Sequence, residues 1–139
     1  MSYHSVTRRF AHHPAEVARA RRMVRSHLDA WGYGRDVEAM ELAVSELVTN
    51  AVVHGRGLID VRVSTNADGI RLEVADEGGG ARQLGRVGDR AAGGVGGWGL
   101  YLVDTLSDAW GSGDRGDVSF VWMERRSRAL GDSAEPGQV

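Results

Sequence analysis

The sequence predicts a single α/β domain, on three observations. The chain has 139 residues, of which 42% are hydrophobic, and this suits one domain with a proper core. Two segments in its first half repeat their apolar residues at helical spacing, and two segments that alternate like strands follow them. A third helical segment then precedes VSFVWM, the most β-prone run. We expect residues 1–126 to form the domain and residues 127–139 a flexible tail.

An edge strand and a helix are expected first. Residues 5–10, SVTRRF, alternate and suit a short edge strand. Pro14 suits the first turn of a helix over residues 15–31, whose apolar residues share one side. Arginines cover the other side, either as a solvated face or as a basic surface for an acidic protein or a phosphate. The glycines of WGYG, residues 31–34, end this helix.

A long amphipathic helix is expected between Asp36, a suitable N-cap, and the glycines that follow His54. Glu46, Asn50 and His54 are four residues apart and therefore line one edge of it. Asparagine is a poor residue for a helix interior, so its position between a glutamate and a histidine indicates a functional role. A carboxylate can activate a proton, and an amide oxygen can hold a hard cation, as magnesium-nucleotide chemistry requires. The alternative is a solvated polar face.

A β-hairpin is expected next, because residues 58–65 and 70–75 alternate and residues 66–69 suit a turn. The second strand leads into Asp76, which is followed by Glu77 and three glycines. A carboxylate at a strand end can accept a hydrogen bond from a ligand that approaches the glycine backbone closely. The alternative is an ordinary turn, in which aspartate and glycine are both common.

The segment 81–95 has little hydrophobic pattern and carries arginines and glycines. So long a connection is uncommon in a compact domain and suits a lid or a binding loop. The alternative is disorder without a function. Gly96, Gly97 and Gly99 then open a helix over residues 98–106. The free N–H groups and the positive dipole end at such a helix N-terminus form an anion site.

Two strands are expected to close the domain. They cover residues 109–111 and 118–124, and the polar residues 112–117 form the turn between them. From Arg125 onward the residues are polar and small, which indicates the tail.

Composition excludes several classes of site. The chain has no cysteine, which excludes disulfides and thiolate metal sites. It has no lysine, which removes a P-loop interpretation. A net charge of -2 gives no general case for nucleic-acid binding. No hydrophobic run has the length of a membrane span, and the N-terminus lacks the apolar core of a signal peptide, so we expect a cytoplasmic protein.

Three motifs carry a resemblance to a known family. ELVTNAVVHG at residues 46–55, DEGGG at 76–80 and GGWGLYLVDTLSDAWG at 96–111 occur in this order. They resemble the asparagine box and the two glycine boxes of the ATP-binding domain of histidine kinases, gyrase, heat-shock protein 90 and mismatch-repair ATPases, the Bergerat fold. The most similar branch is that of the stand-alone anti-sigma factor serine kinases of bacteria. The resemblance covers residues 14–124 and implies a two-layer α/β sandwich, with a mixed, mainly antiparallel sheet and helices on one face.

The resemblance implies roles for five side chains. Asn50 would coordinate Mg²⁺ through its side-chain oxygen, and Glu46 would be the general base for an attacking hydroxyl group or water. His54 would lie near the phosphates of ATP, with a less defined role. Asp76 would accept a hydrogen bond from the adenine amino group, and Ser119 would lie beside the base.

Backbone contacts to the nucleotide are also implied by the resemblance. Two glycines of the first glycine box would let the chain pass the base, and Gly97 and Gly99 would donate N–H groups to the phosphates. Residues 81–95 would form the ATP lid, whose phosphate contacts must come from arginine or backbone. The residues assigned to these contacts are Gly78, Gly80, Gly97, Trp98, Gly99 and Leu100.

The function implied by the resemblance is that of an anti-sigma factor with serine/threonine protein kinase activity. It would use ATP and Mg²⁺ to phosphorylate an anti-anti-sigma protein, and its other partner would be a sigma factor. Arg21, on the first helix, is the candidate contact to the sigma factor, and a homodimer is compatible with the resemblance. One alternative is a nucleotide-gated module that sequesters a partner without phosphotransfer. The other is a structural adaptor that has lost nucleotide binding.

Overall fold

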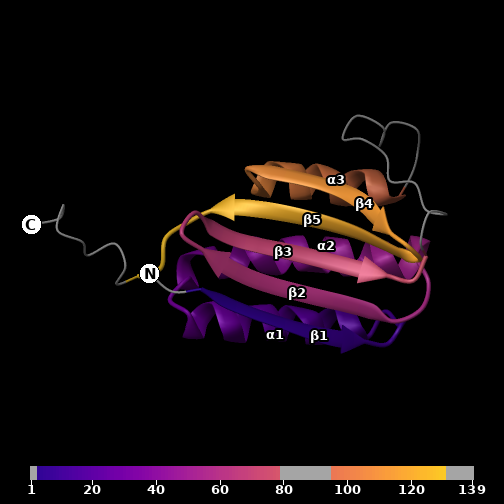
Figure 1. The fold of residues 1–139 in the computed structure, drawn as a ribbon, viewed down its shortest axis with the longest axis horizontal. Coiled ribbons are helices and arrows are strands. Elements are labelled where there is room, and N and C mark those ends of the chain that lie inside the picture. Colours follow the sequence, from indigo (N-terminus) through magenta and orange to yellow (C-terminus); the bar gives the residue numbers. More distant parts are fainter. Residues whose placement is uncertain (1–2, 79–94, 131–139) are drawn as a thin grey trace, which may run out of the picture.

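The structure is a computed structural model that describes residues 3–78 and 95–130. Figure 1 shows a five-stranded sheet with helices packed on one of its faces. The predicted two-layer α/β fold is therefore confirmed. The elements are β1 (His4–Phe10), α1 (Glu16–Ala30), the short 3-10 helix η1 (Gly34–Asp36), α2 (Val37–His54), β2 (Ile59–Asn66), β3 (Gly69–Asp76), α3 (Val95–Leu106), β4 (Ala109–Arg115) and β5 (Val118–Arg126).

The strand order is β1-β2-β3-β5-β4, and all four neighbouring pairs are antiparallel. β1 and β4 are thus the edges, and β3 lies in the middle (Figure 1). The predicted edge strand at the N-terminus is confirmed. Because residues directly opposite in a ladder share a face, the register decides which polar residues meet on the helix side.

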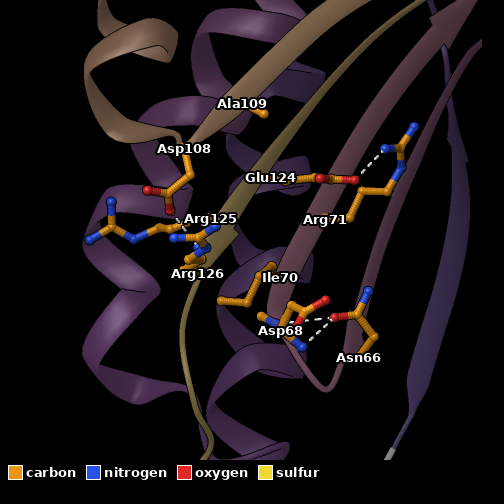
Figure 2. A pocket seen from close by; sticks show the side chains of 10 residues that line it. Asn66, Asp68, Ile70, Arg71, Asp108, Ala109, Glu124, Arg125 and Arg126 are labelled. Carbon is orange, nitrogen blue, oxygen red and sulfur yellow. Dashed lines mark hydrogen bonds and ion pairs between the residues drawn. The ribbon is translucent and has the colours of Figure 1, made fainter.

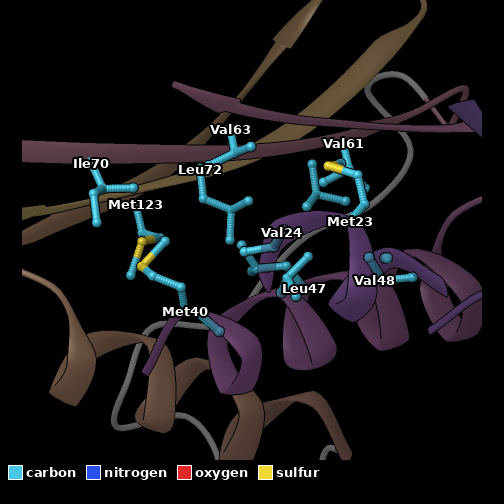
Figure 3. Close-up of a cluster of buried hydrophobic side chains, with 14 of the residues drawn as sticks. Met23, Val24, Met40, Leu47, Val48, Val61, Val63, Ile70, Leu72 and Met123 are labelled. Atoms are coloured by element: carbon cyan, nitrogen blue, oxygen red, sulfur yellow. The ribbon is translucent and has the colours of Figure 1, made fainter. Parts of the chain in front are cut away.

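The core lies between the sheet and α2. Buried residues alternate along β2 and β3, as expected for strands with one face covered. Figure 3 shows these side chains meeting those of α1 and α2. Fully burying one such side chain stabilises the fold by about 1.5–3 kcal/mol. The fully buried members include Val24, Met40, Leu47, Val48, Val61, Val63, Leu72 and Met123.

The helices agree with the sequence patterns except at the start of α3. α1 and α2 lie where their apolar periodicity predicts them. α3 begins at Val95 instead of residue 98, so the glycines expected to precede this helix form its first turns. No helix in the described part of the chain has the length and apolar character needed to cross a membrane.

Asp36 is the N-cap residue of α2 by position, but the predicted side-chain cap is wrong. Its carboxylate makes no capping hydrogen bond. It accepts hydrogen bonds from Arg125 Nε at 2.9 Å and from the hydroxyl of Ser127 instead. Asp36 is buried, and a buried carboxylate is stabilised more by a guanidinium than by a backbone N–H. Arg125 also donates to the carbonyl oxygen of Leu106 at 2.7 Å, which ties this network to the end of α3.

The last hairpin is tighter than its sequence suggests. β4 runs to Arg115, so the predicted turn over residues 112–117 shrinks to two residues, Gly116 and Asp117. The misleading residues are Gly111 and Gly113, which are typical of turns. In the structure they lie beneath the rings of Trp122 and Phe120, where an added Cβ would come within 3.0 and 2.9 Å of ring atoms. Pairing with β5 has therefore overridden local preference.

Residues 127–130, which the sequence assigned to the tail, contact the domain, and the N–H of Ser127 donates to the carbonyl oxygen of Asp68 at 3.2 Å. The Ala129 side chain is buried, and the N–H of Leu130 donates to the carbonyl oxygen of Gly32 at 2.8 Å. The carbonyl oxygen of Arg128 accepts a hydrogen bond from Arg35 at 3.1 Å. The rest of the predicted tail, residues 131–139, lies outside the described residues.

Candidate functional site

The polar edge of α2 runs from Glu46 through Asn50 to His54. Because all three belong to one continuous helix, the four-residue spacing places them one turn apart along it. Glu46 is half-buried, Asn50 is only 4% exposed, and His54 is exposed at the last helical position. This edge is therefore most buried at Asn50, in its middle, and reaches the surface at His54, at the C-terminus of α2.

Asn50 is the buried member of this edge. Its side-chain nitrogen is buried and has no hydrogen-bond partner among the described residues. Leaving a buried donor without a partner costs about 1–3 kcal/mol. A chain that retains such a group gains from a ligand that supplies the missing acceptor. The amide has both a donor and an acceptor to offer, so it fits a ligand with phosphate oxygens and a hard cation.

Asp76 ends β3 and lies on the helix side of the sheet. Its side chain is only 2% exposed. The carboxylate oxygen Oδ1 accepts a hydrogen bond from the N–H of Gly78 at 2.7 Å, in a tight aspartate turn. This turn holds the carboxylate at the strand end instead of letting it extend into solvent.

The C-terminal end of α2 packs directly on that carboxylate. A Cβ added to Gly55 would lie 2.3 Å from Asp76 Oδ2, and one added to Gly78 would lie 2.8 Å from Asp76 Oδ1. Both positions must therefore lack a side chain for the carboxylate to keep this place. Asn50 precedes Gly55 by five residues, or about 7.5 Å along the helix axis. Helix α2, which carries Asn50, and the carboxylate of Asp76 at the end of β3 therefore meet at one end of the domain.

The loop after α2 is held in place by several partners. The N–H of Glu77 donates to the Arg56 carbonyl oxygen at 2.8 Å, and the Glu77 carboxylate accepts from the N–H of Leu58 at 2.9 Å. His12 contacts two carbonyl oxygens, that of Gly57 through Nδ1 at 3.0 Å and that of Val52 through Nε2 at 2.9 Å. The β1–α1 connection thus braces the loop that encloses Asp76.

Ser119 lies opposite Asp76 in the ladder between β3 and β5. It is only 3% exposed, and like Asp76 it faces the helix layer. Its hydroxyl group donates to Asp114 Oδ1 at 2.8 Å, and Asp114 is the residue opposite Ser119 on β4. The structure thus places Ser119 beside Asp76, where the family resemblance expects both to meet the base.

The remaining predicted residues are described only in part. Gly97 belongs to the first turn of α3, whose N–H groups have no intrahelical acceptor, and Gly99 lies in the second turn. Leu100 is buried. The side chain of Trp98 lies outside the described part of the chain, as do Gly80 and all of the predicted lid, residues 81–95, except Val95, which begins α3.

Arg21 is exposed on α1, as a partner contact requires. Its guanidinium lies 3.5 Å from the Ser45 hydroxyl oxygen. One helical turn further, Arg25 makes two hydrogen bonds of 3.0 Å to Glu41, and these raise the pKa of Arg25 above its usual value. Arg21 is therefore held more loosely than Arg25.

Three residues of this region escaped sequence reasoning: Gly55, Asp114 and His12. Gly55 looked like a helix terminator, and its contact with Asp76 has no signal in the local sequence. Asp114 was hidden in the residues assigned to a turn. His12 precedes a helix and shows no periodic pattern, although its neighbour in space is the motif-bearing helix.

A cavity of about 390 Å³ lies at the opposite end of the sheet. Figure 2 shows the side chains that line it, with the β2–β3 turn on one side and Asp108 and Ala109 on the other. Within it Arg71 and Glu124 form an ion pair at 2.7 Å. None of the side chains with a predicted role in nucleotide binding or catalysis lines this cavity. The candidate site is therefore defined by the contacts around Asp76.

Comparisons with known proteins agree with this fold. The profile of the histidine kinase-like ATPase domain matches residues 10–124. No curated protein matches the chain significantly. The RsbU and RsbW domains of Rv1364c from Mycobacterium tuberculosis are similar, with 17% identity and a TM-score of 0.60 over 90% of this chain. The chain spans 33% of that protein's length.

A second solved structure, the Acinetobacter baumannii histidine kinase AdeS, has 15% identity and a TM-score of 0.51. The alignment covers 87% of this chain and 67% of that one. At these identities both similarities concern the fold alone. The family profile, in contrast, runs from the last residue of β1 into β5 and includes all three motifs. The chain therefore belongs to the histidine kinase-like ATPase domain family, and this membership implies that it binds ATP.

Proposed function

We propose that this protein is a bacterial, cytoplasmic anti-sigma factor that binds Mg²⁺ and ATP and phosphorylates a serine or threonine of an anti-anti-sigma protein. The observation that carries the proposal is the buried Asn50 side chain, whose nitrogen lacks a partner among the described residues. It lies on the helix whose end touches Asp76. An amide without a partner among the described residues thus lies on α2, and a carboxylate that suits an amino group lies against the C-terminal end of the same helix.

In this proposal Asn50 holds the phosphate end of the nucleotide. Its oxygen suits Mg²⁺, which prefers oxygen ligands, and its nitrogen can donate to a phosphate oxygen. Bound Mg²⁺ would neutralise charge on the phosphates during transfer. The first turn of α3, which contains Gly97, would add N–H groups that have no intrahelical acceptor and can donate to phosphate oxygens.

Glu46 is the proposed general base, one turn before Asn50. It is half-buried and has no hydrogen bond or ion pair within residues 3–78 and 95–130. A carboxylate without an ion pair is available to take a proton from the hydroxyl group of a protein substrate. A partner would approach over the exposed surface of α1, where Arg21 is the proposed contact to the sigma factor.

The same isolation of Glu46 favours a second function. Catalytic bases are usually oriented by a third group, and among the described residues Glu46 has none. A protein with this arrangement could use ATP only to order its binding surface and sequester a partner. Phosphotransfer distinguishes the two functions.

Nucleotide binding is tested by calorimetric titration of Mg-ATP into the wild type and into Asn50→Ala. We expect the variant to lose affinity by about tenfold to a hundredfold, the range for a charge-assisted contact. Thr49→Ala, an exposed neighbour on α2, is the matched control and keeps wild-type affinity. Equal affinity of Asn50→Ala and the wild type, with and without Mg²⁺, contradicts the role of Asn50.

Phosphotransfer is tested with radiolabelled ATP and purified anti-anti-sigma proteins from the source organism. We expect Glu46→Gln to slow transfer by about 10²- to 10⁴-fold while ATP still binds. Glu38→Gln, exposed in the first turn of α2, loses the same charge and keeps the wild-type rate. Tight ATP binding with no transfer to any of these proteins favours the sequestering function.

A further inference from the structure

Three polar side chains form a row across the sheet. Asp76 on β3 is opposite Ser119 on β5, and Ser119 is in turn opposite Asp114 on β4. Residues paired directly across neighbouring strands share one face, so the three face the helix layer. A hydroxyl group therefore stands between two carboxyl groups, beside the carboxylate that Gly55 and Gly78 enclose.

The proton of the Ser119 hydroxyl group is directed towards Asp114. Ser119 Oγ lies 2.8 Å from Asp114 Oδ1. A carboxylate can only accept a hydrogen bond, so Ser119 must be the donor. Once this proton is committed, the hydroxyl oxygen keeps two lone pairs and has no proton left for a second partner. Because of Asp114, the Ser119 hydroxyl group can therefore only accept a hydrogen bond from a ligand.

A ligand edge in front of this row therefore meets acceptors at both Asp76 and Ser119. An exocyclic amino group has two N–H donors and can satisfy both oxygens. A carbonyl oxygen in the same place faces lone pairs without a donor. Leaving an acceptor without a donor in a buried site carries the full cost of its desolvation.

We propose that Asp114 is a specificity-determining residue that makes Ser119 a pure acceptor, so that the site selects a purine with a 6-amino group over one with a 6-carbonyl group. This rests on the proposed function, in which Asp76 and Ser119 meet the base of the nucleotide. Asp114 acts through Ser119 and is a positioning residue. The preference for adenine then depends on two carboxyl groups, one that faces the base and one that orients its neighbour.

Asp114 is well placed for a test, because it is exposed on the edge strand β4 and contributes little to the core. Asp117 lies in the adjacent turn, is also exposed and carries the same charge. Asp114→Ala removes the acceptor of the Ser119 proton, whereas Asp117→Ala removes only a nearby charge. Comparison of the two variants therefore separates the effect of the hydrogen bond from Ser119 from the effect of losing one negative charge.

The experiment measures dissociation constants for Mg-ATP and Mg-ITP, whose bases differ in the amino or carbonyl group at position 6. The ratio of the two constants is the measure of selectivity. We expect Asp114→Ala to reduce this ratio by on the order of tenfold, the factor that one hydrogen bond supplies. We expect Asp117→Ala to leave it unchanged. Thermal unfolding of each variant verifies that it folds.

The variant Ser119→Ala completes a double-mutant cycle. If Asp114 acts only by orienting the Ser119 hydroxyl group, Asp114→Ala has no effect on the ratio in the Ser119→Ala background. An equal effect in both backgrounds, or an unchanged ratio in Asp114→Ala alone, overturns the proposal while ATP binding stands. A wild type that binds neither nucleotide overturns this proposal and the proposed function together.

Discussion

Gly55 lies directly against the carboxyl group of Asp76, so closely that a Cβ atom on Gly55 would fall 2.3 Å from Asp76 Oδ2. Gly55 is the C-cap residue of α2 and Asp76 is the last residue of β3, so β2, the turn after it and most of β3 lie between them in the sequence. Gly55 has φ -98° and ψ -162°, an extended conformation that any residue can adopt. The glycine is therefore required by the neighbouring carboxylate and not by the backbone.

We predict that Gly55→Ala weakens ATP binding more than it weakens the fold. The methyl group must displace either the Asp76 carboxylate or the end of α2, at a cost of about 1–3 kcal/mol. ATP affinity by calorimetry and the unfolding temperature are the two measurements. Gly34→Ala, which meets only the Asp29 carboxylate at 3.3 Å, is the control. Wild-type ATP affinity in Gly55→Ala would show that the position of Asp76 does not matter.

The two ring nitrogens of His12 predict a role for this residue in stability. Both lie within 3.0 Å of carbonyl oxygens, those of Gly57 and Val52, so the ring bridges the loop after α2 and the last turn of that helix. We expect His12→Ala to lower the free energy of unfolding by about 1–2 kcal/mol. Urea denaturation measures this change.

The neighbouring His13 is a matched control for this prediction. It is exposed, and its Nδ1 accepts a hydrogen bond from the N–H of Ala15 at 3.0 Å, which is a local contact. We expect His13→Ala to lower the free energy of unfolding by less than half as much as His12→Ala does. Equal losses in the two variants would mean that the bridge to α2 contributes nothing of its own.

Arg125 is predicted to be the most costly arginine to remove. It donates to the buried Asp36 carboxylate and to the last carbonyl oxygen of α3, so Arg125→Met leaves both acceptors without this donor. We expect a loss of about 2–3 kcal/mol, because removing one member of a largely buried pair strands the other.

The adjacent residue provides the control for Arg125. Arg126 is exposed, and Arg126→Met is expected to leave the stability almost unchanged. Chemical denaturation of both variants gives the comparison. A larger loss in Arg126→Met than in Arg125→Met would contradict the account of the buried network.

Gly69 is predicted to be essential to the pairing of β3 with β5. It has φ +149°, and an added Cβ would lie 2.2 Å from the carbonyl oxygen of Arg125. We expect Gly69→Ala to cost about 2–4 kcal/mol, from backbone strain together with this clash. Gly116 also has a positive φ, but no atom lies within 4 Å of its added Cβ. Gly116→Ala should therefore cost only about 1–2 kcal/mol, and equal unfolding temperatures would refute the clash.

Local patterns predicted most elements because each element depends on its own periodicity. The apolar repeat of α2 and the alternation of β2 and β3 are visible in the sequence, and both were confirmed. β4 was underestimated because Gly111 and Gly113 are common in turns, and only the rings of β5 explain their presence in a strand. Local sequence predicts a cap at Asp36 and gives no sign of its long-range partner, Arg125, which lies in another element.

The shared helical edge of Glu46, Asn50 and His54 follows from sequence spacing alone, since a helix places residues four apart on one side whatever surrounds it. The position of Asp76, at a strand end beside glycines, is also apparent from local sequence. In contrast, the packing of Gly55 against Asp76 and the hydrogen bond that Ser119 donates to Asp114 become visible only in the folded chain. These contacts depend on strand register and on how α2 packs on the sheet, which are properties of the whole chain. Local preferences act over a few residues, whereas register is set by burial across elements that are distant in sequence.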